Sequence, residues 1–399
     1  MEYVFTEALP VSFDNTEIAF SYKSDKDLQK TYWLFKTINY PILTNVGTKV
    51  TKLALKLKLP IRNVLKNTLF QQFCGGETIA GCSGTIHMLA SHNVKTILDY
   101  SVEVEKTEAG FDHTTEETLR TIAASKNSPD MPFCAFKLTG IVGFKLLARV
   151  QAGKELSPDQ EAAYERGKAR LNRLCQAAHD ADVGIFIDGE ESWIQEVIDD
   201  LADEMMKRYN QEKVIVYNTY QMYRRDMLDN LRKAYQQAVT HQYFLGAKLV
   251  RGAYMEKERE RAEEKGYPDP IHATKKDTDE DYNRAQLFCL NHKQRVSLVS
   301  GSHNEYSNYY LTMLMGKHSM KPDDPRVYFA QLFGMSDNIS FNLSEAGYNV
   351  AKYLPYGPLE SVMPYLFRRA EENTSVRGQS SRELALVEKE LKRRKKGII

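Results

Sequence analysis

The chain has 399 residues, of which 42% are hydrophobic and 27% charged, so it can bury a full-sized core as one large domain or two ordinary ones. Its 54 basic and 53 acidic side chains leave a net charge of +1, which excludes the strongly basic field typical of nucleic-acid-binding proteins. No apolar run approaches the roughly 20 residues that a membrane-spanning helix needs, and the five cysteines form no CxxC pair, which favours a reducing compartment over a thiolate metal site.

Residues 1–90 are predicted to form a helical N-terminal arm. Three segments place apolar side chains at helical spacing with lysines between them, at 25–40, 46–59 and 61–73. The second and third are basic and amphipathic, which is typical either of a packed arm with a solvated lysine face or of a contact with an anionic membrane surface. The stretch FCGGETIAGCSG that follows has glycines but no GxxxxGK[ST] pattern, so we interpret it as a hinge and not as a phosphate loop.

Eight short apolar, β-branched runs follow, separated mostly by charged helical segments. They lie at 96–101, 133–140, 184–190, 214–220, 246–253, 296–303, 327–334 and 350–357. Strands that alternate with helices pair in parallel through crossover connections. Eight such units in about 250 residues predict an α/β fold, a (β/α)₈ TIM-like barrel over residues 91–376. An open eight-stranded sheet fits the same alternation, but no GxGxxG follows the first run.

Polar side chains gather at or near the ends of these runs. They are Asp188, Gln221, Arg251, His303 and Gln331, with Lys137, Lys248 and Tyr353 inside the strands. The carboxyl ends of barrel strands are where barrel enzymes carry their sites. The sequence therefore predicts an active site on that face.

The last of the predicted helices carries the densest group of functional side chains. Tyr365, Arg368, Arg369 and Glu372 are spaced by three and four residues, so they share one helix face. Two guanidinium groups beside an aromatic ring suit a small anionic ligand with an apolar body, because each fork can hold a carboxylate bidentately. A solvated, salt-bridged face is the alternative. Residues 377–399 carry a KRRKK cluster close to their end and are predicted to form a basic amphipathic tail, either solvated or in contact with a membrane or partner.

The sequence resembles the proline dehydrogenase family of FAD-dependent, monofunctional proline oxidases. The strongest motifs are KLVRGAYMEKERERAEEKGYPDP (248–270) and YLPYGPLESVMPYLFRRAEEN (353–373), supported by FIDGEE, VYNTYQMYRRD and YFAQLFGMSD. The resemblance implies a distorted (β/α)₈ barrel whose last helix crosses the mouth. It also implies an oxidoreductase that acts on a CH–NH bond: L-proline becomes Δ1-pyrroline-5-carboxylate by hydride transfer to FAD, the first step of proline catabolism, and the electrons pass to a quinone.

The resemblance also assigns site residues. The substrate positions are Lys137, Asp188, Leu332, Tyr353, Tyr365, Arg368 and Arg369. The FAD positions are Gln221, Lys248, Arg251, Gly252, Ala253, Tyr254, His303 and Glu372. Lysine and arginine would clamp the substrate carboxylate, while the tyrosines and leucine would pack around its ring. For Asp188, we favour a hydrogen bond to Tyr353 as part of a gate over the role of a general base.

Three alternatives stay open. A metal-dependent hydrolase would need more histidines and carboxylates at the strand ends than the sequence offers, so we predict no metal. A hydroxyproline dehydrogenase of the same family is disfavoured because Tyr353 would fill the space of a ring hydroxyl. The third alternative is a non-enzymatic helical module that binds a partner protein.

The expected partners are L-proline, a quinone and a membrane surface, with no nucleic acid. No aldehyde dehydrogenase segment follows residue 373, so we expect the product to pass to a separate pyrroline-5-carboxylate dehydrogenase. The start, MEYVFTEALP, has no leader character, which favours a bacterial cytoplasm, peripheral at the inner membrane, over a mitochondrial matrix or inner membrane.

Overall fold

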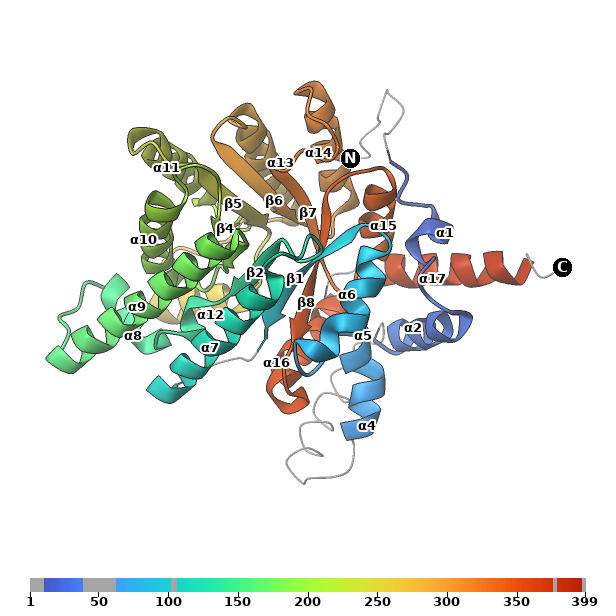
Figure 1. Ribbon diagram of the computed structural model, residues 1–399, viewed down its shortest axis with the longest axis horizontal. Helices are drawn as coiled ribbons and strands as arrows, with labels where there is room; N and C mark the ends of the chain where they lie inside the picture. Colours follow the sequence, from blue (N-terminus) through green and yellow to red (C-terminus); the bar gives the residue numbers. More distant parts are fainter. Residues whose placement is uncertain (1–10, 39–61, 102–105, 376–378, 397–399) are drawn as a thin grey trace.

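The computed structural model describes residues 11–38, 62–101, 106–375 and 379–396, and these form a closed parallel barrel in the order β1 to β8 (Figure 1). The strands are β1 (Val94–Tyr100), β2 (Phe133–Phe136), β3 (Gly184–Ile187), β4 (Val216–Gln221), β5 (Leu245–Val250), β6 (Val296–Gly301), β7 (Val327–Leu332) and β8 (Val350–Tyr356). Each lies within or beside one of the eight predicted runs, and β8 closes the ring on β1 from Val94 opposite Val350. The predicted fold class is confirmed.

Helices surround the strands in Figure 1. They are α7 (Glu108–Ser125), α8 (Phe144–Gln151), α9 (Pro158–Ala181), α10 (Ser192–Tyr209), α11 (Met227–Thr240), α12 (Met255–Lys265), α13 (Lys275–Asn291), α14 (Glu305–Lys317), α15 (Asp337–Glu345) and α16 (Leu359–Ser375). Local sequence sets several starts: Ser157 with Gln160, and Thr274 with Asp277, form capping boxes that satisfy the first backbone N–H groups of α9 and α13.

The barrel interior is filled by side chains that alternate along the strands. The apolar layer consists of Ile97, Phe133, Ala135, Phe186, Tyr217, Val299, Ala330 and Ala351. Because strand side chains alternate with a period of two, the residue two positions further along also faces inward, at the carboxyl end. These residues are Asp99 in β1, Lys137 just after β2 and Asp188 just after β3. The same periodicity that builds the core therefore places charged groups at the mouth.

The N-terminal arm and the C-terminal helix pack together outside the barrel. The arm contains α1 (Thr16–Ala19), α2 (Asp25–Ile38), α4 (Arg62–Leu65), a π turn (Lys66–Phe70), α5 (Gln71–Phe73) and α6 (Ser83–Ala90), and the C-terminal helix is α17 (Gln379–Lys396). Leu386 and Val387 of α17 are buried against Ala19, Phe20 and Leu28 of the arm. Figure 1 shows α17 beside α1 and α2.

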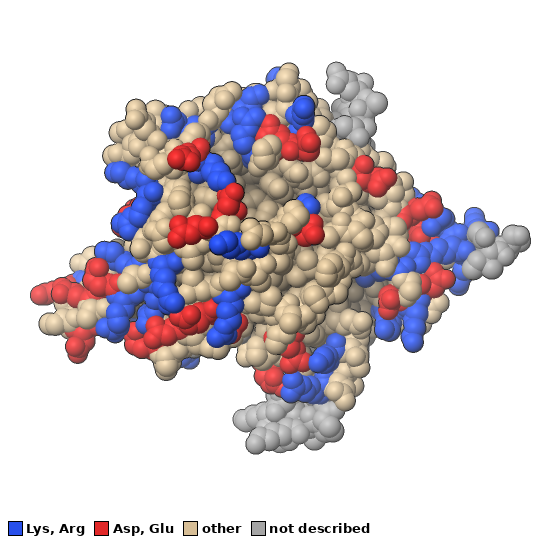
Figure 2. All heavy atoms as spheres, viewed as in Figure 1, with Lys and Arg blue, Asp and Glu red and all other residues tan. Residues whose placement is uncertain are grey.

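The basic end of α17 is also tied to the arm. Arg394 donates to the carbonyl of Lys23 at 2.9 Å and to Asp25 at 2.7 Å, and Lys and Arg side chains gather at this end in Figure 2. The apolar side of the predicted basic tail is therefore buried against the N-terminal arm.

The predicted helix at 46–59 lies outside the described residues, and the domain boundaries at 90 and 376 stay predictions. No helix among the residues that the structure describes is both long and apolar enough to span a bilayer.

Candidate active site

A cavity of about 2300 Å³ opens at the carboxyl ends of the strands. It is lined by strand-end residues together with parts of α8, α12 and α16. All the predicted site residues line it except Glu372, whose side chain is outside what the structure describes. Ordinary ligand pockets measure roughly 300–1,000 Å³, so this cavity has room for a dinucleotide and a small substrate together.

Three polar side chains form a closed triangle on the cavity floor. Tyr353 donates to Asp188 Oδ1 at 2.7 Å, and Lys248 Nζ donates to the same oxygen and to the Tyr353 hydroxyl, at 3.0 Å from the latter. Lys248 is buried and its ammonium also lies 5.3 Å from the centre of the Phe186 ring. The expected hydrogen bond between Asp188 and Tyr353 is present, and Lys248 is its third member. The buried ammonium group is thus hydrogen-bonded on two sides.

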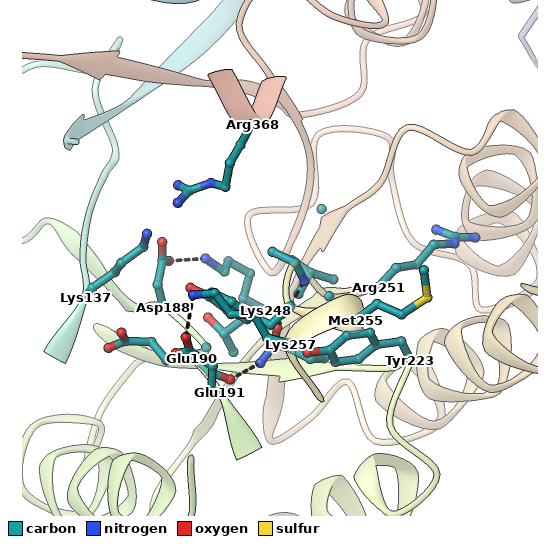
Figure 3. A pocket seen from close by; sticks show the side chains of 18 of the residues that line it. Lys137, Asp188, Glu190, Glu191, Tyr223, Lys248, Arg251, Met255, Lys257 and Arg368 are labelled. Atoms are coloured by element: carbon teal, nitrogen blue, oxygen red, sulfur yellow. Dashed lines mark hydrogen bonds and ion pairs between the residues drawn. The ribbon is translucent and has the colours of Figure 1, made fainter. Parts of the chain in front are cut away.

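Positive charge surrounds the space next to Asp188. Figure 3 shows Arg368 reaching from its helix and Lys137 reaching from the opposite side toward the same space near Asp188. Arg369 is buried, and its guanidinium lies 5.3 Å from the centre of the Tyr365 ring, a cation–π distance. The structure thus brings the three predicted cations to one cavity with the predicted aromatic wall beside them.

Two carboxyl groups at the mouth were missed by sequence reasoning. Burial, with Asp188 nearby, raises the pKa of Asp99 to about 6, and burial raises the pKa of Glu190 to about 7. Ser101 donates to Asp99, while Glu190 accepts from the Thr139 backbone N–H at 3.0 Å and from its hydroxyl at 2.5 Å. Both carboxyls stand at the ends of predicted strand runs, so the rule that singled out Asp188 would have found them.

The segment after β5 provides a close backbone approach to the cavity. Gly252 has φ +137°, and a Cβ there would lie 2.5 Å from the Tyr223 ring, so this position requires glycine. Next to it, the Ala253 N–H faces Gln221 Oε1 at 3.4 Å, and Gln221 Nε2 donates to the Glu190 carbonyl at 2.6 Å. A chain without side-chain bulk beside a large cavity suits a dinucleotide.

The Arg251 side chain is fixed by several hydrogen-bond partners that the sequence does not indicate. Its guanidinium donates to Asp279 at 2.8 Å, Ser302 at 2.7 Å and Ser307 at 2.9 Å, and lies 4.4 Å from the centre of the Tyr282 ring. These contacts fix the orientation of the charge. Further basic residues of the same part of the cavity, which sequence reasoning did not name, are Lys257, Arg259 and Lys275. Each of these four cations is paired with a carboxylate, namely Asp279, Glu191 or Asp269, so a pyrophosphate would bind them by exchanging for these partners.

His303 is a neutral imidazole. Burial, reinforced by the nearby Lys352, Arg369 and Arg251 charges, lowers its pKa to about 3. Its Nδ1 lies 2.8 Å from Ser336 Oγ, and the Leu332 N–H points to its Nε2 at 3.5 Å. It therefore offers hydrogen-bonding capacity to the cavity without adding a charge. In the part of the chain that is described, no three His, Cys, Asp or Glu residues are grouped as metal ligands, so no observation favours the hydrolase alternative.

Comparison with known proteins decides the family. The family model described as Proline dehydrogenase matches residues 82–382. The chain belongs to the proline dehydrogenase family. This confirms the resemblance, and with it an oxidoreductase class that acts on proline.

Curated relatives and solved structures agree with this membership. Proline dehydrogenase 1, mitochondrial, of Dictyostelium discoideum is 32% identical over 93% of this chain and 73% of its own length. The carbapenem antibiotics biosynthesis protein CarD of Pectobacterium carotovorum subsp. carotovorum is 35% identical over 81% of this chain and 83% of its own length. The human proline dehydrogenase 1, mitochondrial, is 41% identical over 59% of this chain, which spans only 40% of that protein.

Among solved structures, proline utilization A from Bdellovibrio bacteriovorus superposes with a TM-score of 0.72 at 18% identity, covering 94% of this chain and 40% of that one. At this identity the likeness shows the fold alone. The relatives of this proline dehydrogenase family member thus include mitochondrial and bacterial proteins, and the roles of its single residues stay predictions.

Proposed function

We propose that this chain oxidises L-proline to Δ1-pyrroline-5-carboxylate with FAD as its cofactor. One observation carries the proposal: Lys137, Arg368 and Arg369 line the same cavity as a wall of aromatic and aliphatic side chains. The chain that forms this cavity belongs to the proline dehydrogenase family. When bound, FAD supplies the hydride acceptor. The residues around it bind and orient the substrate.

The carboxylate of proline is recognised by fixed positive charge. Arg368 and Lys137 flank the space near Asp188 from two sides (Figure 3), and Arg369 is buried against Tyr365. Charge-assisted hydrogen bonds strengthen where water is excluded. An anionic group held here by arginine forks has one orientation, which fixes the ring carbon beside the nitrogen relative to the cofactor.

The pyrrolidine ring meets a wall that is shaped and held in place. Tyr353 cannot swing freely, because its hydroxyl bonds to Asp188 and Lys248. Tyr365 and Leu332 line the same cavity. A ring hydroxyl would have to displace the pinned Tyr353, so we propose proline over hydroxyproline as the preferred substrate.

The substrate amine reaches its reactive form by losing a proton. Asp188 already accepts two hydrogen bonds through its Oδ1, from Lys248 and Tyr353, so this oxygen is engaged in holding the two side chains in place. We therefore propose that solvent water takes the proton at mildly alkaline pH, while Asp188 holds Tyr353 in place as a gate element.

For the electron acceptor we propose a quinone reached at a membrane surface. The support lies in the arm, where Trp33 is 61% and Val64 63% exposed and lysines stand nearby, with Lys36 Nζ 5.1 Å from the centre of the Trp33 ring. Exposed aromatic and aliphatic side chains among lysines suit an anionic interface. Vesicles with anionic lipid should retain the protein at low salt and release it at high salt; equal partitioning with and without lipid contradicts this contact.

The remaining partners follow from the same reaction. We propose that the product passes to a pyrroline-5-carboxylate dehydrogenase. We also propose a bacterial cytoplasm, at the inner face of the membrane, with the mitochondrial matrix as the alternative. All five cysteines are buried free thiols, which fits a reducing compartment.

The proposed function is tested by anaerobic mixing of the purified protein with L-proline, hydroxyproline and lactate in turn. We expect L-proline to bleach the flavin absorbance, hydroxyproline to do so far more slowly, and lactate not at all. Bleaching by lactate but not by L-proline would overturn the proposed substrate, and bound zinc in place of flavin would favour the hydrolase.

A further inference from the structure

The loop between β7 and α15, residues 333–336, forms part of the cavity wall. Leu332, just before the loop, and Ser336, at its end, both line the cavity. Ser336 Oγ lies 2.8 Å from Nδ1 of His303, whose Nε2 faces the Leu332 N–H at 3.5 Å. The position of this loop therefore decides where His303 and Leu332 sit.

The backbone of the loop is irregular. Gly334 has φ +78° and Ser336 has φ +50°. A left-handed conformation is unfavourable for a residue with a side chain, so Ser336 adopts it only because surrounding contacts hold it there.

Those contacts come from three different elements. The Ser336 backbone N–H donates to Glu383 of α17, a buried carboxyl that itself lines the cavity. Lys352 of β8 donates to the Met335 carbonyl at 2.5 Å. Gln72 of the arm donates to the Gly334 carbonyl at 2.8 Å.

Glu383 is the contact that brings the C-terminal helix into the site. Next to it on α17, Arg382 pairs with Glu305 at 2.9 Å and with Asp14 at 2.6 Å, which fixes the helix over the cavity edge. Leu386 and Val387, one turn on, are buried in the arm. The helix is thus docked by apolar burial and ion pairs, while Glu383 alone among these residues contacts the loop.

We propose that Glu383 is a positioning residue, which through Ser336 holds His303 and Leu332 in the geometry that the substrate and cofactor require. The C-terminal helix then completes the active site, although its sequence predicts only a basic tail. This inference rests on the proposed function for its kinetic readout, but its first readout needs neither FAD nor proline.

A neutral amide is a close mimic of Glu383 in this setting. Burial, with Asp337 nearby, raises its pKa to about 7. A glutamine side chain keeps an oxygen acceptor for the Ser336 N–H at nearly the same volume. The Glu383→Gln variant therefore removes the charge but keeps the contact, whereas Glu383→Ala removes both the charge and the contact.

The first experiment measures amide hydrogen exchange of residues 333–336 in the full chain. We expect Glu383→Ala to raise the exchange rate of the Ser336 amide at least about tenfold, since a lost hydrogen bond exposes it to local opening. Glu383→Gln and the matched control Glu388→Ala, on the same helix, should keep the wild-type rate. An unchanged exchange rate of the Ser336 amide in Glu383→Ala would contradict the proposed role of its hydrogen bond to Glu383.

The second experiment compares kinetics and flavin spectra of the holoenzymes. We expect Glu383→Ala to raise KM for L-proline several-fold more than it lowers kcat and to shift the bound-flavin absorbance, with rescue by Glu383→Gln. Ser336→Ala keeps the backbone donor to Glu383 but loses the hydroxyl contacts to His303 and to the Glu383 carboxyl. It should therefore reproduce the same changes, while the Ser336 N–H bond and the ion pairs of Arg382 keep α17 docked, even where Glu383→Ala folds poorly. A wild-type flavin spectrum and KM in Ser336→Ala would overturn the proposal that Glu383 positions His303 and Leu332 through Ser336. If L-proline does not reduce the wild-type enzyme, the proposed function is refuted instead. The hydrogen-exchange experiment then still tests the contact between Glu383 and Ser336.

Discussion

Tyr353 of β8 donates a 2.7 Å hydrogen bond to Asp188, the residue that follows β3, across the mouth of the barrel. Lys248 of β5 bonds to both, so side chains from three separate parts of the barrel form one rigid unit. Two of its members, Asp188 and Lys248, lie below Arg368 in Figure 3, and Lys137 reaches toward Asp188 from the side. The rigidity of the unit gives the substrate wall a defined shape.

Replacing Tyr353 with phenylalanine should weaken proline oxidation while preserving the fold. The change removes a donor to a partly buried carboxylate, and a hydrogen bond to a charged group contributes about 1.5–3 kcal/mol. We expect kcat/KM for L-proline to fall roughly 10- to 100-fold. Tyr328→Phe, a change in the apolar layer below, is the control and should leave kcat/KM within about twofold. Equal losses in both variants would contradict a specific role for the pair.

A serine at position 353 should widen the substrate range. The smaller side chain leaves space where a ring hydroxyl would lie, and its loss also breaks the contacts to Asp188 and Lys248. We expect the ratio of kcat/KM for hydroxyproline to that for L-proline to rise at least about tenfold, even as activity on L-proline falls. An unchanged ratio would show that Tyr353 does not set this specificity.

Glu190 should make the protein less stable as the pH rises through neutrality. Its pKa is about 7 in the folded state against about 4.3 in an unfolded chain. Between these values the unfolded state releases the proton and the native state keeps it, so the stabilising effect is full below the unfolded pKa and lost as pH rises toward 7. The effect is on the order of 3 kcal/mol.

Urea unfolding at pH 5 and pH 8 measures this dependence. Glu190→Gln removes the titration, so the fall in stability between the two pH values should shrink relative to wild type. Glu165→Gln, at a side chain that is 66% exposed, should leave it unchanged. A wild-type pH dependence in Glu190→Gln would show that Glu190 titrates normally.

A methyl group at position 252 should loosen cofactor binding. Alanine there would place its Cβ 2.5 Å from the Tyr223 ring at φ +137°, so the backbone beside the cavity must move. We expect Gly252→Ala to purify with less than about half the flavin per chain of the wild type. Gly266→Ala is the matched control: it also has positive φ, at +70°, but nothing lies within 4 Å of its Cβ, so it should keep full flavin while losing about 1 kcal/mol of stability.

The sequence predicts this architecture where the pattern is local. Strand periodicity places Lys137 and Asp188 two residues beyond inward-facing Ala135 and Phe186, so their side chains had to reach the mouth. Helical spacing likewise puts Tyr365 and Arg369 on one face, and both line the cavity.

What the sequence does not reveal are contacts between distant segments. Glu383 meets Ser336 across 47 residues and Tyr22 meets Asp337 across 315. No periodicity encodes such pairs, because they form only once the arm and α17 dock on the closed barrel. For the same reason the pattern identified Arg251 as a cation but could not show that Asp279, Ser302 and Ser307 hold it.

The most direct measurement is an anaerobic titration of the flavoprotein with L-proline in the wild type and in Arg368→Ala and Arg369→Ala, with flavin content checked beforehand. Each guanidinium removed should raise the proline concentration for half-reduction roughly 10- to 100-fold at equal flavin content, since charge-assisted hydrogen bonds contribute about 1.5–3 kcal/mol each. Reduction of both variants at the wild-type proline concentration would contradict recognition of an amino-acid carboxylate by these two arginines.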